Sequence, residues 1–443
     1  MRRILNAAAK AAAGLVFCAA ALFPAMAAAP ETAAPSVVVL RTWYKLSLEL
    51  VRHTPTYTPP VASRAFAYLG VAAYEAVASG SPGLRSLAGQ LNGLEALPQR
   101  EAGLEYAPAI MLDAALAATM RSLFDNTGPT GQRAMDSVAA KLGAKAAAGV
   151  PADVAARSRD HGAAIAAHVA AWAAGDGGAV VENMGFPLDY ALAPGAAHWL
   201  PTSLIAQQQK PLLPQWGRNR TFAMPAGTTC PLPPPPVYSE DESSDFYRQA
   251  REVYDASRTL TAKQREIARF WADDAMLSTT PPGHWIAIIL QILEREGAGS
   301  ERSVDILARA GIAAGDAFIG CWGTKYRYDL VRPVTYIRRV IDPQWEPLLF
   351  TPPFPEYPSG HSTQSAAFAV VLTRFFGESF SFQDDALAPD GFSPRTFSSF
   401  AEAADDAAVS RLYGGIHFRA AIQRGSEQGR CIGAFAAALR TRR

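Results

Sequence analysis

The sequence has little cysteine, little net charge and almost no strand-forming pattern. With only 4 cysteines in 443 residues, it is not a small module held together by disulfides. Its 41 basic and 40 acidic residues give a formal net charge of +1, so no global field attracts nucleic acid or an anionic membrane. Alternating Val, Ile and Thr segments bounded by turns do not recur, which argues against a β-sandwich or barrel.

What the sequence does have is apolar side chains, with 49% hydrophobic against 18% charged residues. That balance is typical of a globular protein with a large buried core. At roughly 150 residues per domain, the length favours two or three domains.

The first residues resemble an export signal. Arg2, Arg3 and Lys10 precede an uncharged apolar run, and Ala25-Met26-Ala27 follows with the small-x-small pattern of a cleavage site. A membrane anchor is the alternative, but the run is shorter than the roughly 20 residues that span a bilayer. We therefore expect residues 1–27 to be a signal peptide, the protein to be exported to the periplasm or secreted, and the mature chain to contain no membrane span.

Three cysteines remain after that cleavage, namely Cys230, Cys321 and Cys431. An oxidising compartment then allows one disulfide and leaves one thiol over. The sequence does not choose the pair.

Helical composition dominates both ends of the mature chain, and proline and glycine interrupt it in the middle. We expect an N-terminal helical bundle over residues 28–174 and a C-terminal one over 245–443, so the predicted fold is all-α with two packed helical bundles. Residues 175–244 form a connector, which is a spacer or a binding loop. The stretches expected to be helical are 61–77, 111–124, 131–148, 153–174, 245–257, 261–276, 285–293, 303–318, 361–376, 401–412 and 417–439.

The first chemical motif is a pair of cations, Lys325 and Arg332, followed by Pro333. A spacing of seven predicts that both lie on the same side of a helix-like turn that Pro333 ends. A solvated basic surface is the alternative interpretation.

The second motif is Pro358-Ser359-Gly360-His361 ahead of a helical stretch. A turn entering a helix presents backbone N–H groups and a positive dipole end to an anion, while Ser359 adds a donor and His361 an acid or base. An ordinary turn with Ser359 as cap explains the same residues.

The third motif combines Arg411, a Gly414-Gly415 bend and His417, again before a helix. Read alone, it is also a helix end closed by glycine. Together the three motifs supply the donors that a tetrahedral or trigonal-bipyramidal oxyanion requires.

These motifs match the pattern K-x6-RP, PSGH and SR-x5-H in order and spacing. In this respect the chain resembles the superfamily of vanadium-dependent haloperoxidases and type 2 phosphatidic acid phosphatases. The segments 63–67, 74–76 and 270–274 are similar to its bacterial haloperoxidase-like branch.

The resemblance implies roles for individual residues. Vanadate, the implied cofactor, or phosphate would be bound by Lys325, Arg332, Ser359, Gly360 and Arg411. His417 would be the group bound to vanadium, His361 the acid or base, and Asp274 the ionic partner of Arg411. Trp322 and Phe354 match aromatic positions of fungal-type chloroperoxidases, although core packing explains them equally well.

Two chemistries use this set of residues. In a haloperoxidase, hydrogen peroxide binds the vanadate, Lys325 polarises it, and halide is oxidised to hypohalous acid. In an acid phosphatase, His417 attacks a phosphate ester to form a phosphohistidine and His361 protonates the leaving oxygen. Such phosphatases commonly carry Asp four residues after the nucleophile, where this chain has Ala421.

The haloperoxidase is therefore the leading prediction and the phosphatase the alternative. A non-catalytic oxyanion-binding protein is a third hypothesis, against which the intact histidine pair argues. Of the histidines outside the motifs, His284 is expected to be packed or on the surface.

Overall fold

The computed structural model describes residues 33–203, 205 and 208–443. The predicted signal peptide over residues 1–27, with Cys18, lies outside these residues. Residues 34–443 form one unit by their internal contacts. No helix in the described part of the chain is both long and apolar enough to cross a membrane.

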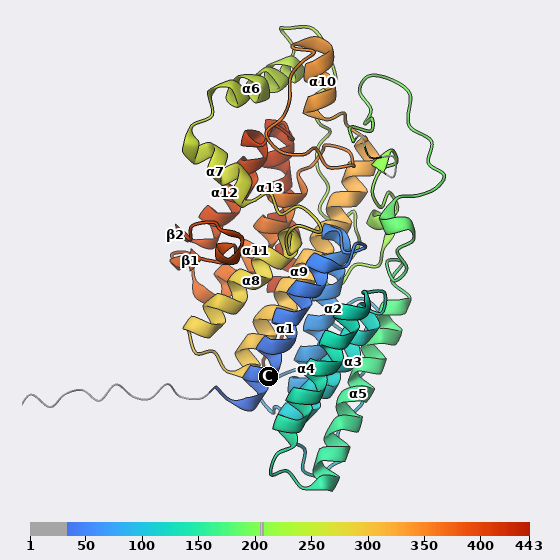
Figure 1. Cartoon of the computed structure of the whole chain (residues 1–443). Helices are drawn as coiled ribbons and strands as arrows, with labels where there is room; N and C mark the ends of the chain where they lie inside the picture. Colours follow the sequence, from blue (N-terminus) through green and yellow to red (C-terminus); the bar gives the residue numbers. More distant parts are fainter. Residues whose placement is uncertain (1–32, 204, 206–207) are drawn as a thin grey trace, which may run out of the picture. The chain divides into compact units, whose positions relative to one another are not determined.

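Five helices make up the N-terminal part: α1 (Pro35–His53), α2 (Pro59–Ala78), α3 (Pro108–Leu123), α4 (Pro129–Ala147) and α5 (Ala152–Ala174) (Figure 1). The first four begin with proline. Proline suits a first helical turn because its ring presets φ and its missing N–H has no intrahelical acceptor there. These boundaries therefore follow from local sequence.

The connector forms only two short 3₁₀ turns among its described residues, η1 (Asn183–Gly185) and η3 (Trp216–Arg218). The C-terminal part then contains α6 (Asp245–Thr259), α7 (Ala262–Phe270), α8 (Thr280–Arg295), α9 (Ser300–Tyr328), α10 (Pro333–Val340), α11 (Gly360–Phe376), α12 (Phe400–Tyr413) and α13 (Arg419–Ala437). Between α11 and α12 lie a 3₁₀ turn, η4 (Ala388–Asp390), and one antiparallel pair of strands, β1 (Phe382–Asp384) and β2 (Arg395–Phe397). The all-α fold class is confirmed.

Several boundaries differ from the predictions, and α1 and α10 were not among the predicted stretches. Helix α7 ends at Phe270 rather than 276, because Asp273 and Met276 take positive φ angles that no α-helix accommodates. Helix α9 continues past 318 to Tyr328, and Pro333, predicted to end a helix, instead begins α10. Apolar periodicity is a poor guide to the exact ends of elements.

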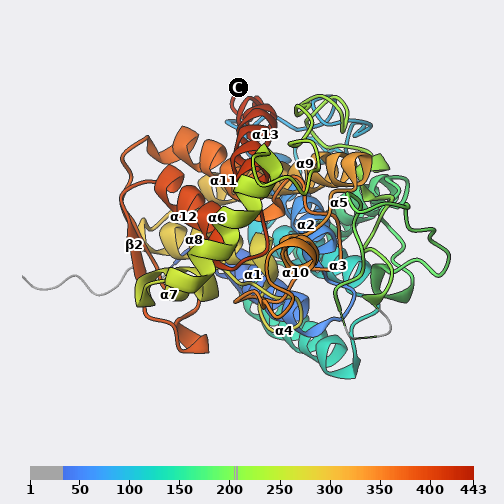
Figure 2. The same ribbon diagram turned by 90° about the horizontal axis from the view of Figure 1, so that it is seen from above.

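The long helix α9 lies beside α2, and Figure 2 shows the pair near the middle of the described unit. Glycines make this close approach possible. A Cβ atom added to Gly70 would lie 2.8 Å from the Cα of Ala308, and one on Gly311 would lie 2.5 Å from the carbonyl oxygen of Phe66. The main hydrophobic core thus includes residues of α1, α2 and α3 together with α8, α9, α11 and α12. The division at residues 174 and 245 stays a prediction.

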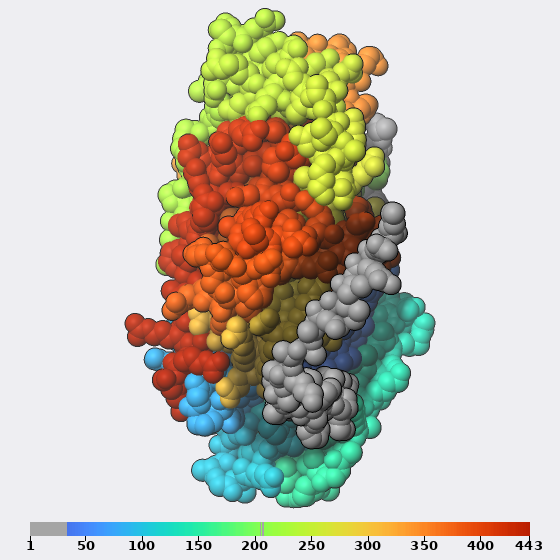
Figure 3. Space-filling view, turned by 90° about the vertical axis from the view of Figure 1, so that its left-hand side faces the viewer, coloured from blue at the N-terminus to red at the C-terminus, as the bar shows by residue number. Residues whose placement is uncertain are grey.

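A second hydrophobic cluster joins α6 and α10 to the start of α13. It includes Phe246, Val253, Ile337, Trp345 and Phe418. In Figure 1 α6 and α10 lie together at the top. Figure 3 shows the yellow-green surface around α6 above the orange and red surface of α11 to α13. This cluster supports the segment that carries the third motif.

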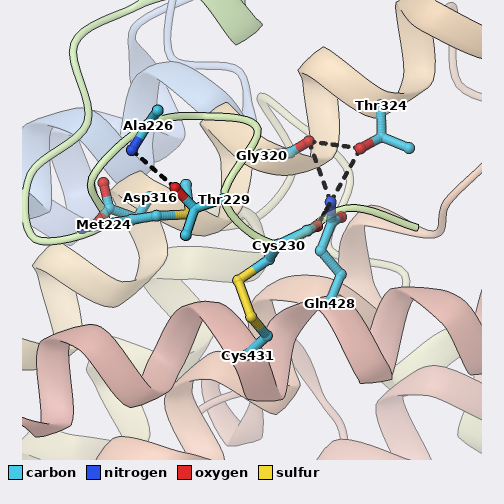
Figure 4. Close-up of a disulfide and its surroundings, with 9 residues drawn as sticks. All are labelled: Met224, Ala226, Thr229, Cys230, Asp316, Gly320, Thr324, Gln428 and Cys431. Atoms are coloured by element: carbon cyan, nitrogen blue, oxygen red, sulfur yellow. Dashed lines mark hydrogen bonds between the residues drawn. A yellow bond between two sulfur atoms is a disulfide. The ribbon is translucent and has the colours of Figure 1, made fainter.

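A disulfide between Cys230 and Cys431 joins the connector to α13 over a sequence separation of 201 (Figure 4). Cys321 is the thiol left over and is buried. Next to the disulfide, Gln428 Nε2 donates hydrogen bonds to the carbonyl oxygen of Cys230 and to Thr324 Oγ1, at 3.1 and 3.0 Å. The connector is therefore bound to the C-terminal helices.

Candidate active site

Ser359, the first site residue to describe, is the N-cap of α11. Its Oγ accepts hydrogen bonds from the backbone N–H and the hydroxyl of Ser362, at 3.3 and 2.9 Å. Because both bonds are accepted, the hydroxyl hydrogen of Ser359 stays available as a donor. The N–H groups of the first turn, including that of Gly360, have no carbonyl partner within the helix. The capped helix start that the second motif predicts is thus formed, and its binding of an anion stays a prediction.

Arg332 reaches the same region by a different route from the one predicted. Helix α9 ends at Tyr328, and the left-handed conformation of Asp329, with φ of 45°, turns the chain out of the helix. Arg332 is then the N-cap of α10. A turn, and not helical spacing, therefore places Arg332 relative to Lys325.

The Arg332 guanidinium is fully buried and almost fully bonded. Its Nε donates to the carbonyl oxygen of Phe354 and its Nη1 to that of Ile416, both at 2.8 Å. Its Nη2 has no hydrogen-bond partner among the described residues. Burial lowers the pKa of Arg332 to about 10, so the group remains a cation at neutral pH with the two N–H donors of Nη2 left over.

Lys325 is also buried, but its three donors are engaged. Nζ donates to the carbonyl oxygens of Pro355, Glu356 and Pro358. Burial lowers its pKa to about 7. An ammonium group has three hydrogens, so direct donation to an oxyanion, as the resemblance implies, requires one of these bonds to be exchanged.

Arg411, in the last turn of α12, is held by backbone rather than by Asp274. Its Nη2 donates to the carbonyl oxygen of Trp271 at 2.6 Å, and its Nε donates to Ser410 Oγ at 3.0 Å. Asp274 is exposed and forms no ion pair within 4 Å of Arg411 among the described residues, but its charge, like that of Asp273, raises the pKa of Arg411 against the lowering by burial. The pairing of Asp274 with Arg411 therefore stays a prediction.

The two motif histidines each lie next to an arginine. Nε2 of His417 is 3.2 Å from Arg332 Nη1, and Nε2 of His361 is 3.4 Å from Arg411 Nη1. Burial lowers the pKa of both histidines well below the ordinary value, and nearby arginine charges lower it further. Both imidazoles are thus neutral at neutral pH and each can offer a lone pair.

Glu356 is a site residue that the sequence analysis missed. It is completely buried, and its Oε1 accepts hydrogen bonds from His417 Nδ1 at 2.9 Å and from the backbone N–H of Phe418 at 2.8 Å. Burial raises the pKa of Glu356 to about 7. The available signal was an isolated carboxylate among the prolines and aromatics of residues 350–358.

The two aromatic residues line the cationic side of the site. The Phe354 ring centre lies 4.9 Å from the Arg332 guanidinium and 5.1 Å from Lys325 Nζ. Trp322 packs against Phe354 with ring centres 4.9 Å apart and donates from Nε1 to the Leu212 carbonyl oxygen. Both residues therefore pack in the core, and Trp322 also ties the connector to the site.

His284 lies in a buried ionic group behind the site. Its Nδ1 is 3.1 Å from the carboxylate of Asp273, and its Nε2 is 3.0 Å from Asp384. Its ring packs against Trp271, with ring centres 4.7 Å apart. Since the Trp271 carbonyl accepts from Arg411, this group supports the segment that holds the third motif.

Comparisons with known proteins identify the family. Residues 305–443 match the family model of the VCPO second helical-bundle domain. The crystal structure of the first bacterial vanadium-dependent iodoperoxidase is 36% identical, with a TM-score of 0.85 over 93% of this chain and 98% of that one. The chain belongs to the vanadium-dependent haloperoxidase family.

More distant family members show the extent of the similarity. A holo bacterial vanadium-dependent chloroperoxidase is 17% identical with a TM-score of 0.66 over 88% of this chain, which shows a shared fold alone. The vanadium chloroperoxidase of Curvularia inaequalis is 30% identical over 132 residues. That match spans 24% of this chain and only 22% of that relative.

The residues present fit vanadate, the cofactor of this family. A buried guanidinium nitrogen without an acceptor, Arg332 Nη2, is the donor that a bound oxyanion would satisfy. Burial and then the charges of Arg332, Lys325 and Arg411 lower the pKa of His417, and Arg332 Nη1 lies 3.2 Å from its Nε2. Such a set of cations and donors suits an oxyanion held next to a nitrogen ligand.

Proposed function

We propose that the protein is a haloperoxidase that uses bound vanadate and hydrogen peroxide to oxidise halide to hypohalous acid. The observation that carries this proposal is the unpartnered Arg332 Nη2 beside the lone pair of His417 Nε2, in a chain of the vanadium-dependent haloperoxidase family. Vanadate, when bound, supplies a Lewis-acid centre that activates hydrogen peroxide toward halide.

The residues of this chain hold and surround that group. The oxyanion would be bound by Arg332, Arg411, the Ser359 hydroxyl and the Gly360 N–H. Because these groups are shielded from water, their electrostatic attraction for the anion is stronger than it would be at the surface. His417 would provide the nitrogen ligand through Nε2. His361, half-buried and neutral, would accept and return the proton of peroxide at Nε2, the nitrogen next to Arg411.

Iodide is the halide to examine first, because the relative at 36% identity is named as an iodoperoxidase. Phe354 and Trp322 form an aromatic wall beside the Arg332 and Lys325 cations, so a halide would meet apolar surface as well as positive charge there.

An acid phosphatase remains the second candidate, and one observation favours it. The Glu356 carboxylate bonds Nδ1 of His417, so this histidine has an orienting acid although Ala421 occupies the expected position. In that reaction Nε2 of His417 would form a bond to phosphorus, the ester P–O bond would break, and His361 would protonate the leaving oxygen.

The deciding experiment measures halide oxidation by the purified mature protein with hydrogen peroxide and iodide or bromide, with and without added vanadate. Hydrolysis of p-nitrophenyl phosphate is measured in parallel. Oxidation that depends on vanadate supports the haloperoxidase, whereas ester hydrolysis inhibited by vanadate, without halide oxidation, supports the phosphatase. If neither activity is detected, the remaining hypothesis is a non-catalytic oxyanion-binding protein.

We also propose that the protein is exported and cleaved after Ala27. The disulfide between Cys230 and Cys431 supports this proposal, since disulfides persist in oxidising compartments. Cell fractionation with N-terminal sequencing tests it, and a cytosolic chain that keeps residues 1–27 would contradict it.

A further inference from the structure

We infer that Glu356 is the positioning residue for His417, holding its ring so that the lone pair of Nε2 faces the oxyanion. This inference rests on the proposed oxyanion site, but not on which reaction the site performs. Glu356 Oε1 lies 2.9 Å from Nδ1, and the residue is 0% exposed.

The tautomer of His417 is determined from both sides of the ring. Oε1 of Glu356 already accepts from the N–H of Phe418, and in the carboxylate form it can only accept from Nδ1 as well, so Nδ1 carries the hydrogen. On the opposite side, Arg332 Nη1 at 3.2 Å can only donate, so Nε2 carries the lone pair. The two contacts agree on the tautomer, and they place the one nitrogen able to bind vanadium or attack phosphorus next to Arg332, whose hydrogen bond to that lone pair is exchanged when an oxyanion binds.

Glu356 is itself held in place by the first motif. Its backbone N–H donates to the Leu330 carbonyl oxygen at 2.9 Å, and its own carbonyl oxygen accepts from Lys325 Nζ at 3.0 Å. Lys325 therefore braces the segment from which Glu356 reaches His417. The carboxylate also accepts from the N–H of Phe418, the N-cap of α13, which keeps Oε1 at the start of that helix.

No acidic residue on α13 can do the same. Position 421, one helical turn after His417, is alanine, and its carbonyl oxygen accepts from the backbone N–H of Ser359 at 3.0 Å. The orienting carboxylate comes instead from the segment before the second motif. Glu356 thus links all three motifs into one arrangement.

The test compares Glu356→Ala and Glu356→Gln with the wild-type protein, using Glu252→Gln as the control. Glu252 is a matched choice because it pairs with Arg419 at the start of the same helix without reaching His417. The first readout is the ¹H–¹⁵N correlation spectrum of labelled histidines in protein without vanadate. The signal of His417 is assigned as the one that disappears in the His417→Gln variant. The second is the affinity for orthovanadate and for inorganic phosphate by calorimetry.

We expect wild-type His417 to carry its hydrogen on Nδ1, and Glu356→Ala to show a mixture of tautomers. Affinity should fall about 10- to 100-fold in Glu356→Ala, as for other outer-shell partners of ligating histidines. Glu356→Gln should keep the tautomer, because the amide oxygen still accepts, while losing part of the affinity with the charge. Glu252→Gln should match wild type in both readouts.

Wild-type affinity and tautomer in Glu356→Ala would overturn the inference, as would a hydrogen on Nε2 of His417 in the wild-type protein. If Glu356→Ala does not fold, Glu356→Gln decides, and unchanged affinity there overturns the inference. Because both readouts use protein that is not turning over, an absence of halide oxidation would count against the proposed function alone.

Discussion

Arg332 and Arg411 are the guanidinium groups of the proposed anion site, and backbone carbonyls hold both in place. Backbone carbonyls of Phe354 and Ile416 orient Arg332, and the Trp271 carbonyl orients Arg411. A planar guanidinium bonded in this way keeps its remaining donor in a defined direction. This is the physical reason why lysine is a poor replacement at either position.

For Arg332→Lys we expect the affinity for orthovanadate to fall about 10-fold or more, because one ammonium nitrogen cannot reach both backbone carbonyls and the anion in the directions that the planar guanidinium covers. Calorimetric titration measures this change. Arg327→Lys, an exposed cation in the last turn of α9, should leave the affinity unchanged. Equal affinities in wild type and Arg332→Lys would place the anion elsewhere.

His284 makes stability depend on pH above neutrality. Burial by itself would lower its pKa, but Asp273 and Asp384 together raise it to about 10, against 6.5 for an ordinary histidine. Between these values the folded state keeps a proton that the unfolded state has lost. The stabilisation is therefore complete below about pH 6.5 and is lost as pH rises toward 10.

We expect the free energy of unfolding of the wild-type protein to fall between pH 7 and 9.5, with this group contributing about 1.4 kcal/mol per pH unit. Urea denaturation at several pH values measures the slope. In His284→Asn the slope should be shallower, even though the variant is less stable overall. An unchanged slope in that variant would show that His284 is not the group responsible.

The packing of α13 against α11 positions the second motif. Gly425, Gly429 and Gly433 recur every four residues on α13 and face the first turns of α11. A Cβ atom on Gly429 would lie 2.0 Å from the carbonyl oxygen of Thr363, and one on Gly425 would lie 2.7 Å from that of Ser359. Neither backbone atom can yield without moving α11, which carries His361.

Gly429→Ala should therefore destabilise the fold by about 1–3 kcal/mol, the usual cost of overpacking, and should weaken orthovanadate binding because Ser359 and His361 move with α11. Urea denaturation and calorimetry measure the two effects. Gly323→Ala is the matched control in α9, since its added Cβ meets its nearest atom at 3.7 Å. A Gly429→Ala protein as stable as Gly323→Ala would mean that the helices are less closely packed than described.

The connector is part of the folded molecule and not a free spacer. The Leu212 carbonyl accepts from Trp322, the Pro233 carbonyl accepts from Tyr357, and three backbone N–H groups over Phe222 to Met224 donate to Asp316 in α9. The disulfide between Cys230 and Cys431 adds a covalent link to α13. The whole molecule therefore depends on a segment with little regular structure.

Replacing both Cys230 and Cys431 by serine should lower the free energy of unfolding by about 2–5 kcal/mol, because the long loop is no longer closed in the unfolded state. Limited proteolysis should then cut within residues 175–244 at lower protease concentration. Reducing agent should reproduce the effect in wild type and add nothing in the double variant. Equal stability of the oxidised wild type and the double variant would contradict this account.

The sequence by itself determined the helical class, most helix positions and the local form of the motifs, because apolar periodicity, N-terminal prolines and helix caps act over a few residues. Ser359 as the N-cap of α11 and the Gly414-Gly415 bend are examples. Even there, helical spacing misplaced Arg332, since a single left-handed residue at Asp329 ends the helix.

Only the tertiary structure decided which groups pair across the site. Among the described residues Asp274 makes no ion pair within 4 Å of Arg411, whereas Glu356 reaches His417 from 61 positions away. The pairing of Cys230 with Cys431 and the carbonyl ligands of Lys325 were equally out of reach. Such choices depend on how helices distant in sequence approach one another, and the burial that makes these contacts strong exists only after that packing.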